Sequence, residues 1–245
     1  MKKHLQGRAG RILSVILFSV GLLLGLAFSA AAVWADLEAS LFDSALGADE
    51  SLKTLNCPVI ITPKESGVVS ARFGNPSDRA VLRTVRAHIS YGFATLIREA
   101  STQFVLEPGE SRKLEWEVGS DDAAWERLVL VRINVLRNHP LPSVTGSCGI
   151  LVMNLPILTG GQFVALILTL SLLGIAAGAA LWASERSSWT ARMQALTTPL
   201  AVLTALVLAT MLTGALGWWA LGLLLILFAL ILVASVAAWT VLKAS

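Results

Sequence analysis

The sequence predicts a bundle of four transmembrane helices with an all-β sandwich domain inserted after the first helix. The first observation is composition: the 245 residues are 55% hydrophobic and 14% charged, whereas a soluble domain is about 45–50% apolar and about 25% charged. The second is distribution, because four charge-free apolar stretches each approach the roughly 20 residues that cross a bilayer as a helix. The third is period-two alternation of apolar residues between the first and second stretches, which indicates strands.

The apolar stretches set the expected domain boundaries. Residues 36–161 form a polar segment of 126 residues, close to the size of one ordinary domain. The expected parts are a cytoplasmic N-terminus (1–11), a transmembrane helix (12–35), an extracytoplasmic domain (36–161), a helix (162–183), a cytoplasmic loop (184–198), two further helices (199–217 and 218–242) and a cytoplasmic tail (243–245).

Charge gives the expected orientation. The two termini and the loop 184–198 together carry seven Lys and Arg against one Glu, whereas residues 36–161 carry 12 Lys and Arg against 15 Asp and Glu. Short basic segments stay on the cytoplasmic side of a membrane. We therefore expect a multi-pass protein of the cell (plasma) membrane with both termini inside and residues 36–161 outside. The basic balance belongs to the membrane flanks and does not indicate nucleic acid binding. No Gly-rich phosphate loop follows an expected strand, so nothing indicates nucleotide binding.

The first apolar stretch has a second interpretation. Basic residues, an apolar core and the small residues 29–32 also describe a secretory signal peptide, for which residues 33–35 could form the cleavage site. The apolar stretch is 24 residues long, and a signal core has about 7–15. We therefore expect a retained helix or uncleaved signal anchor, with cleavage as the alternative. Either outcome leaves the following segment outside.

Tryptophan placement agrees with four spans in contact with the lipid bilayer. Indole prefers the headgroup level, where an apolar ring meets a hydrated N–H group. Packing against neighbouring helices is the alternative for each ring. Six of the eight tryptophans lie at or beside expected helix ends: Trp34, Trp182, Trp189, Trp218, Trp219 and Trp239.

The outer segment contains about seven expected strands separated by turn residues. Alternation such as Leu114, Trp116 and Val118 between charged neighbours indicates strands with one buried face. Short strands with frequent turns favour an antiparallel sandwich. The expected strands are 57–62, 67–73, 80–91, 96–106, 111–118, 127–137 and 148–155.

Two turn motifs carry a resemblance. The turn Asn75-Pro76-Ser77-Asp78 follows an early strand, and Leu106-Glu107-Pro108-Gly109-Glu110-Ser111 leads into an alternating strand. Residues 68–135 thereby resemble bacterial immunoglobulin-like or fibronectin-III-like modules. The resemblance implies an immunoglobulin-like sandwich and protein–protein contact, and it transfers no functional residue, since fold does not determine function.

The two cysteines, Cys57 and Cys148, both lie in the outer segment, on the first and last expected strands. Such strands are neighbours in many sandwiches, and an oxidising compartment permits pairing. We expect a disulfide that ties the two ends of the domain together. Two buried free thiols are the alternative.

Small residues recur every fourth position in three of the four helices. Such stripes allow helix backbones to approach closely within lipid. They serve either the packing of the chain's own bundle or docking of membrane-protein partner subunits. The expected helix-packing residues are Gly21, Gly25, Gly174, Gly178, Ala201, Ala205, Ala209 and Gly217.

The sequence offers no catalytic, cofactor or metal motif. No Asp, Glu, Lys, Arg or His lies inside an expected span, and such residues usually mark ion paths or proton relays. Asp121 and Asp122 with Glu126 form an acidic loop that lacks the alternating ligands of a calcium loop, so we interpret it as a solvated turn. His88 is expected on an outward strand face.

The expected function is therefore non-enzymatic. We expect an accessory or structural membrane subunit whose outer sandwich contacts partner proteins. The alternative is a transmembrane component of an ABC-type exporter or related transport complex, because one helix, an outer domain and three helices is also the order seen in macrolide-exporter-type permeases.

Overall fold

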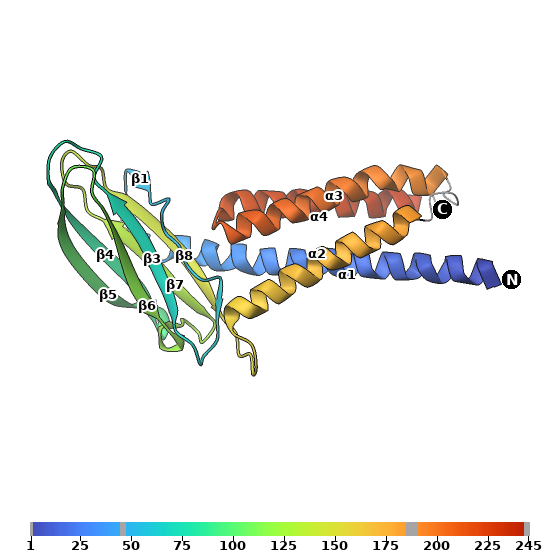
Figure 1. The fold of residues 1–245 in the computed structure, drawn as a ribbon, viewed down its shortest axis with the longest axis horizontal. Coiled ribbons are helices and arrows are strands. Elements are labelled where there is room, and N and C mark those ends of the chain that lie inside the picture. Colours follow the sequence, from blue (N-terminus) through green and yellow to red (C-terminus); the bar gives the residue numbers. More distant parts are fainter. Residues whose placement is uncertain (1, 45–47, 185–190, 243–245) are drawn as a thin grey trace. The chain divides into compact units, whose positions relative to one another are not determined.

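The computed structural model describes residues 2–44, 48–184 and 191–242. The described residues form four long helices, and a group of strands is inserted between the first and second of them (Figure 1). In chain order the elements are α1 (Lys2–Leu41), β1 (Glu50–Ser51), β2 (Ile60–Ile61), β3 (Gly67–Gly74), β4 (Val81–Tyr91), β5 (Phe93–Leu106), β6 (Ser111–Val118), the 3-10 turn η1 (Ser120–Asp122), β7 (Leu128–Val135), β8 (Val144–Val152), α2 (Gly160–Ser184), α3 (Ala191–Ala215) and α4 (Trp219–Leu242).

The chain divides into two compact units. Residues 34–164 form the β domain, which includes the last turns of α1 and the first residues of α2. Residues 1–33 and 165–245 form the helical unit. The expected outer segment, residues 36–161, matches the β domain within a few residues.

Two sheets form the β domain. The larger has six strands in the order β1-β8-β7-β4-β5, with β2 also paired to β8, and the smaller pairs β3 with β6. Both β1 and β2 run parallel to β8, while the other pairs are antiparallel. The expected antiparallel pairing therefore holds for the longer strands, whereas β1 and β2 are parallel to β8, because the short segments before β3 return alongside the last strand. The sequence pattern also missed β1 and placed the starts of β5 and β8 three and four residues late.

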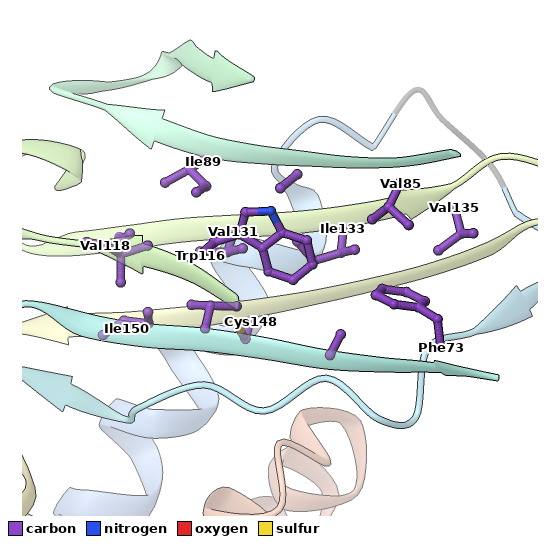
Figure 2. Packing of buried hydrophobic residues seen from close by; sticks show 14 of the residues in the cluster. Phe73, Val85, Ile89, Trp116, Val118, Val131, Ile133, Val135, Cys148 and Ile150 are labelled. Atoms are coloured by element: carbon purple, nitrogen blue, oxygen red, sulfur yellow. The ribbon is translucent and has the colours of Figure 1, made fainter. Parts of the chain in front are cut away.

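The main core lies between the two sheets. Figure 2 shows Phe73 and Trp116 from the smaller sheet among Val85, Val131 and Ile133 from the larger one. These side chains alternate along their strands, so each sheet buries one face against the other. The period-two row Leu114, Trp116 and Val118 therefore identifies the core-facing side of β6 correctly, although Leu114 is only partly buried.

Strand β7 is buried at all eight positions, not at alternate ones. Its second face carries Leu128 and Leu130, which pack against Ala35, Ala39 and Phe42 at the end of α1. The helix continues to Leu41, six residues beyond its expected end, and the last turns cover the sheet. A strand covered on both faces has no solvated side, which explains why its burial does not alternate.

The helical unit contains most of the four apolar segments. Among the described residues, four helices are long and apolar enough to cross a membrane: Ile12–Leu41, Gly160–Ser184, Thr197–Ala215 and Trp219–Val236. Leu22, Ile175, Val207 and Met211 form a core where α1, α2 and α3 meet.

Helix α3 departs from the expected boundaries. It begins at Ala191, inside the expected loop 184–198, and it contains Pro199. Proline inside a helix is tolerated where neighbouring groups satisfy the freed carbonyl, as membrane helices permit. Residues 185–190 of the expected loop lie outside the described residues.

Candidate interaction surfaces

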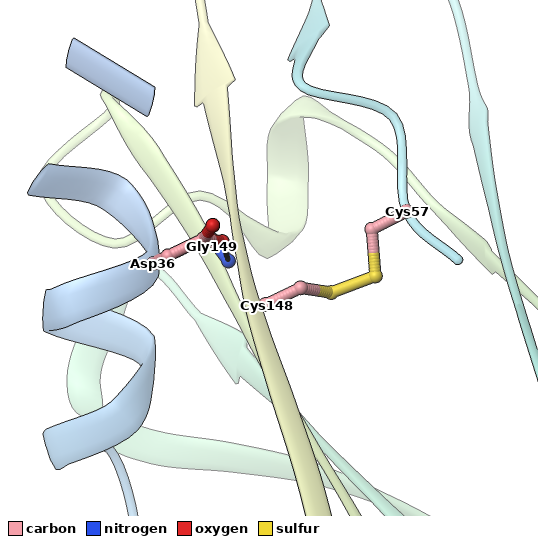
Figure 3. The surroundings of a disulfide bond; sticks show 4 residues. All are labelled: Asp36, Cys57, Cys148 and Gly149. Carbon is pink, nitrogen blue, oxygen red and sulfur yellow. Dashed lines mark hydrogen bonds between the residues drawn. A yellow bond between two sulfur atoms is a disulfide. The ribbon is translucent and has the colours of Figure 1, made fainter. Parts of the chain in front are cut away.

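A disulfide joins Cys57 to Cys148, as expected. The two residues are 91 apart in the sequence and their Cα atoms are 6.5 Å apart. Figure 3 shows the bond running from β8 to the neighbouring segment that precedes β2. Cys57 itself lies outside any strand, which corrects its expected position. Closing a loop of this length stabilises the folded state by about 4–5 kcal/mol in the chain-entropy model.

The last turns of α1 pack directly on β8 beside the disulfide. The backbone N–H of Gly149 donates a 3.1 Å hydrogen bond to the carboxylate of Asp36 (Figure 3). A Cβ atom on Gly149 would overlap the backbone carbonyl of Ala35, so this close approach requires glycine. Sequence reasoning missed this contact, because an isolated glycine in a strand specifies no partner.

Polar side chains of the large sheet hold the C-terminal end of α1. Arg132 donates hydrogen bonds to the carbonyls of Ser40 and Phe42, at 3.3 and 3.1 Å. Ser40 lies in the last turn of α1, where carbonyls lack a partner within the helix, and Phe42 is the first residue after it. His88 lies 2.5 Å from the carboxylate of Asp43 and is buried. His88 lies on the face of β4 opposite the inter-sheet core, as expected, but it is buried because the end of α1 and the residues after it cover that face.

The two turns that carry the immunoglobulin-like resemblance contact each other through Asn75. Its side-chain amide donates to the carbonyls of Arg79 and Leu106 at 2.8 and 2.9 Å. Its backbone N–H donates to the carbonyl of Glu110, and its carbonyl accepts from Gly109. Asn75 is buried and joins three segments, so the asparagine is needed for the turn and not only tolerated there.

The acidic loop of residues 121–126 contacts a neighbouring strand through Asp122. Asp122 is buried, and its carboxylate accepts hydrogen bonds from Arg98 on β5 and from the backbone of Gly119. The interpretation as a solvated turn was therefore wrong for Asp122, although Asp121 and Glu126 are exposed. Among the described residues, no group of three or more His, Cys, Asp or Glu could hold a metal ion.

Glycines allow α1 and α2 to approach closely in the helical unit. A Cβ atom on Gly21 would lie 2.7 Å from the backbone nitrogen of Ile175, and one on Gly178 would lie 2.7 Å from Phe18. Ser171 donates a 2.7 Å hydrogen bond to the carbonyl of Gly21, and Ser14 donates to that of Gly178. The expected packing residues Gly25 and Gly174 meet similar close neighbours, with nearest atoms at 2.8 and 3.0 Å.

The expected stripe on α3 does not pack within the bundle. Ala201 and Ala205 are exposed, Ala209 is half-buried, and the buried face of α3 is instead formed by Val207 and Met211. Gly217 follows the helix with a positive φ of 69°, the conformation that ends helices at glycine. A period of four identifies a face of a helix, but it does not say what covers that face.

The six expected interface tryptophans differ in exposure. Trp34 and Trp218 are more than half exposed, and Trp182 and Trp219 are partly buried. Trp189 and the side chain of Trp239 lie outside the described residues. The placement of these rings at a membrane interface stays a prediction.

Strand β5 is an edge strand. Among the described residues, its 14 residues pair only with β4. Every odd-numbered position from Phe93 to Val105 is exposed, so one face is open along its whole length. Leu96, Ile97 and Val105 are apolar residues that remain 43–52% exposed on this strand. A long unpaired edge offers backbone N–H and C=O groups to another extended chain.

Comparison with known proteins adds little. No family model and no curated protein matches the chain. A CARDB domain from Pyrococcus furiosus, determined in complex with di-metal ions, is 14% identical with a TM-score of 0.31, over 43% of this chain and 89% of that chain. A β-glucosidase from Erythrobacter marinus is 18% identical with a TM-score of 0.30, over 41% of this chain and 15% of that chain.

A β-glucuronidase from Bacteroides uniformis is 14% identical with a TM-score of 0.29, over 39% of this chain and 12% of that chain. The chain thus covers less than a fifth of the two glycosidase chains. At these TM-scores the likenesses carry no argument about fold or function.

Proposed function

We propose that the protein is a non-enzymatic membrane-anchored subunit whose outer immunoglobulin-like sandwich binds a segment of a partner protein along the edge of β5. The observation that carries the proposal is the open edge of this strand, with Leu96, Ile97 and Val105 exposed along it. Natural proteins usually shorten, cover or charge such an edge. An edge of this length suits a partner that adds a strand, in which backbone hydrogen bonds supply affinity and side chains supply specificity.

The charges on β5 do not close the edge completely. Arg98 turns inward to Asp122 and to the carbonyl of Glu117. Glu99 lies 3.7 Å from Arg86 of the neighbouring strand β4. Both charged side chains are thus engaged within the domain, and the backbone beside them is left for a partner.

The same proposal includes the topology. The chain crosses the cell membrane with both termini in the cytoplasm, and residues 36–161 lie on the extracytoplasmic side. The disulfide between Cys57 and Cys148 supports an oxidising location for the β domain, and the basic flanks support cytoplasmic termini. The ABC-exporter alternative rests on the order of helices alone.

Site-specific photo-crosslinking in native membranes tests the proposal. A photoreactive residue at Ile97 or Val105 should give one reproducible protein adduct that maps to β5, and the same residue at Val68 on β3, equally exposed, should not. Ile97→Lys should abolish the adduct formed from Val105, because a charge on the edge opposes strand addition. Val68→Lys is the matched control. The proposal would be overturned if the adduct from Val105 persisted in the Ile97→Lys variant. It would also be overturned if the Val68 position gave the same adduct yield as Ile97 or Val105.

A further inference from the structure

Three exposed aromatic side chains lie together at one end of the β domain. Tyr91 pairs with Phe93 across the β4–β5 turn, and the backbone N–H of Trp125 donates to the carbonyl of Gly92 at 3.1 Å. Tyr91, Phe93 and Trp125 are 52–59% exposed. Tyr91 is the chain's single tyrosine. We call these three residues the aromatic end.

The fold holds these rings outward. Ala124 is fully buried against the end of α1, and its neighbour Trp125 adopts a positive φ of 53°. A positive φ is costly for a bulky residue and persists only where the surroundings impose it. Ala94, beside Phe93, packs in the same cluster as Ala124. Ala94 and Ala124 therefore pack toward the end of α1, while their neighbours Phe93 and Trp125 stay exposed.

The aromatic end lies where the chain passes into its apolar helices. The N–H of Val152, the last residue of β8, donates to the carbonyl of Arg127, two residues from Trp125. Seven residues then lead to Gly160 at the start of α2, and a chain of that length spans at most roughly 28 Å. Ile157, in this connection, is 89% exposed.

The end of α1 approaches from the same side. Ala35 and Asp36 contact Gly149, while Phe42 and Asp43 contact Arg132 and His88 further along the sheet. The helix therefore reaches the sheet at the end near Trp125, and its last residues lie progressively further from that end. Both covalent connections of the β domain to apolar helices leave from one end.

We propose that the aromatic end inserts into the headgroup layer of the bilayer that α1 and α2 enter. Tyrosine and tryptophan combine an apolar ring with one polar group, which suits the boundary between acyl chains and water. Phe93 and Ile157 supply purely apolar surface to the same layer. The inference rests on the proposed membrane anchoring. Insertion of the aromatic end adds a second contact between the β domain and lipid. Such a contact restricts the tilt of the domain and the direction in which β5 faces.

The test uses the full-length chain in phosphatidylcholine vesicles. A photoreactive phenylalanine analogue replaces Phe93 or Trp125, and mass spectrometry identifies the adducts. Leu82 is the matched control, because it is 44% exposed but lies at the opposite end of β4. Phe228 on α4, 59% exposed, reports whether the helices are in lipid at all. Formation of the Cys57–Cys148 disulfide shows that each variant is folded.

Lipid adducts at positions 93 and 125, with none above background at 82, are expected. Labelling at 228 without labelling at 93 and 125 would overturn the insertion and leave the anchoring intact. Absence of lipid adducts at position 228 would instead contradict the membrane anchoring, and the proposed insertion with it. In native membranes, protein adducts at 93 and 125 without lipid adducts would identify the aromatic end as a protein-binding surface and would likewise overturn the proposal.

Discussion

The guanidinium of Arg98 on β5 donates two 2.8 Å hydrogen bonds to the carboxylate of Asp122, one to each oxygen. A third bond from Arg98 reaches the carbonyl of Glu117 on β6 at 3.0 Å. One side chain thus joins the large sheet, the small sheet and the turn between β6 and β7. Paired planar geometry of this kind makes a strong charge-assisted interaction.

Replacing Asp122 with Asn should therefore destabilise the β domain. The variant weakens the bonds to Arg98 and Gly119, and we expect a loss of roughly 1–3 kcal/mol. Chemical unfolding of the detergent-solubilised full chain measures the change in midpoint. Asp121→Asn, at the exposed neighbouring position, is the control and should leave the midpoint unchanged. Equal effects of both substitutions would contradict a specific role for the Arg98 pair.

Gly149→Ala should detach the last turns of α1 from β8. The added methyl group would overlap the carbonyl of Ala35, and neither backbone can move without disturbing the disulfide-linked strand. Hydrogen exchange should show lost protection of the amides of residues 35–42. Gly74→Ala is the control, because the nearest atom to its new methyl group is 4.0 Å away. Unchanged protection in the Gly149 variant would show that the helix end has room to shift.

Gly21→Val should disrupt the pairing of α1 with α2. Even a Cβ atom at this position lies 2.7 Å from the nitrogen of Ile175 and 2.8 Å from the carbonyl of Ser171. We expect a lower thermal unfolding temperature in detergent, since close backbone contact is a main source of helix association in lipid. Ala205→Leu on the exposed face of α3 should have little effect on the isolated chain. A loss of stability from Ala205→Leu equal to that from Gly21→Val would contradict this assignment of the two faces.

The pairing of β1 with β8 should weaken in acid through Asp49. The hydroxyl and the backbone N–H of Ser143 both donate to its carboxylate and lower its pKa, with a smaller contribution from Arg137. A pKa lowered by folding contributes stability above the unfolded value of about 3.9. That contribution is lost as the pH falls through the lower pKa of the folded state.

Exchange of the Leu52 amide, which donates to Thr145, reports this local opening. Its protection should fall below about pH 4 in the wild type. Ser143→Ala removes the hydroxyl donor, so the protection should be lower and less dependent on pH. A wild-type protection that is constant down to pH 2 would refute the prediction.

Much of the architecture could be predicted from the sequence. Four charge-free stretches identify the four apolar helices, and the period-two row of residues 114–118 identifies the core face of β6. The cysteine pairing could also be predicted, because with two cysteines only one intramolecular pairing exists. These features depend on composition and local spacing, which the sequence displays directly.

The local pattern failed where one element covers another. The sequence places His88 on an outward strand face and Asp122 in a solvated turn, yet the end of α1 covers the first and Arg98 pairs with the second. Trp125 has no periodic neighbours, so its place beside Tyr91 depends on a hydrogen bond between two loops.

The sequence alone therefore determined that this protein has four apolar helices and a disulfide-linked β domain with a period-two core. Tertiary structure decided which surfaces remain open. The end of α1 covers one face of β7, the outer edge of β5 is unpaired among the described residues, and the aromatic end is exposed. The physical reason is that hydrophobic periodicity reports which side chains leave water. The choice between burial within the chain and burial against a partner or lipid depends on contacts between residues far apart in sequence.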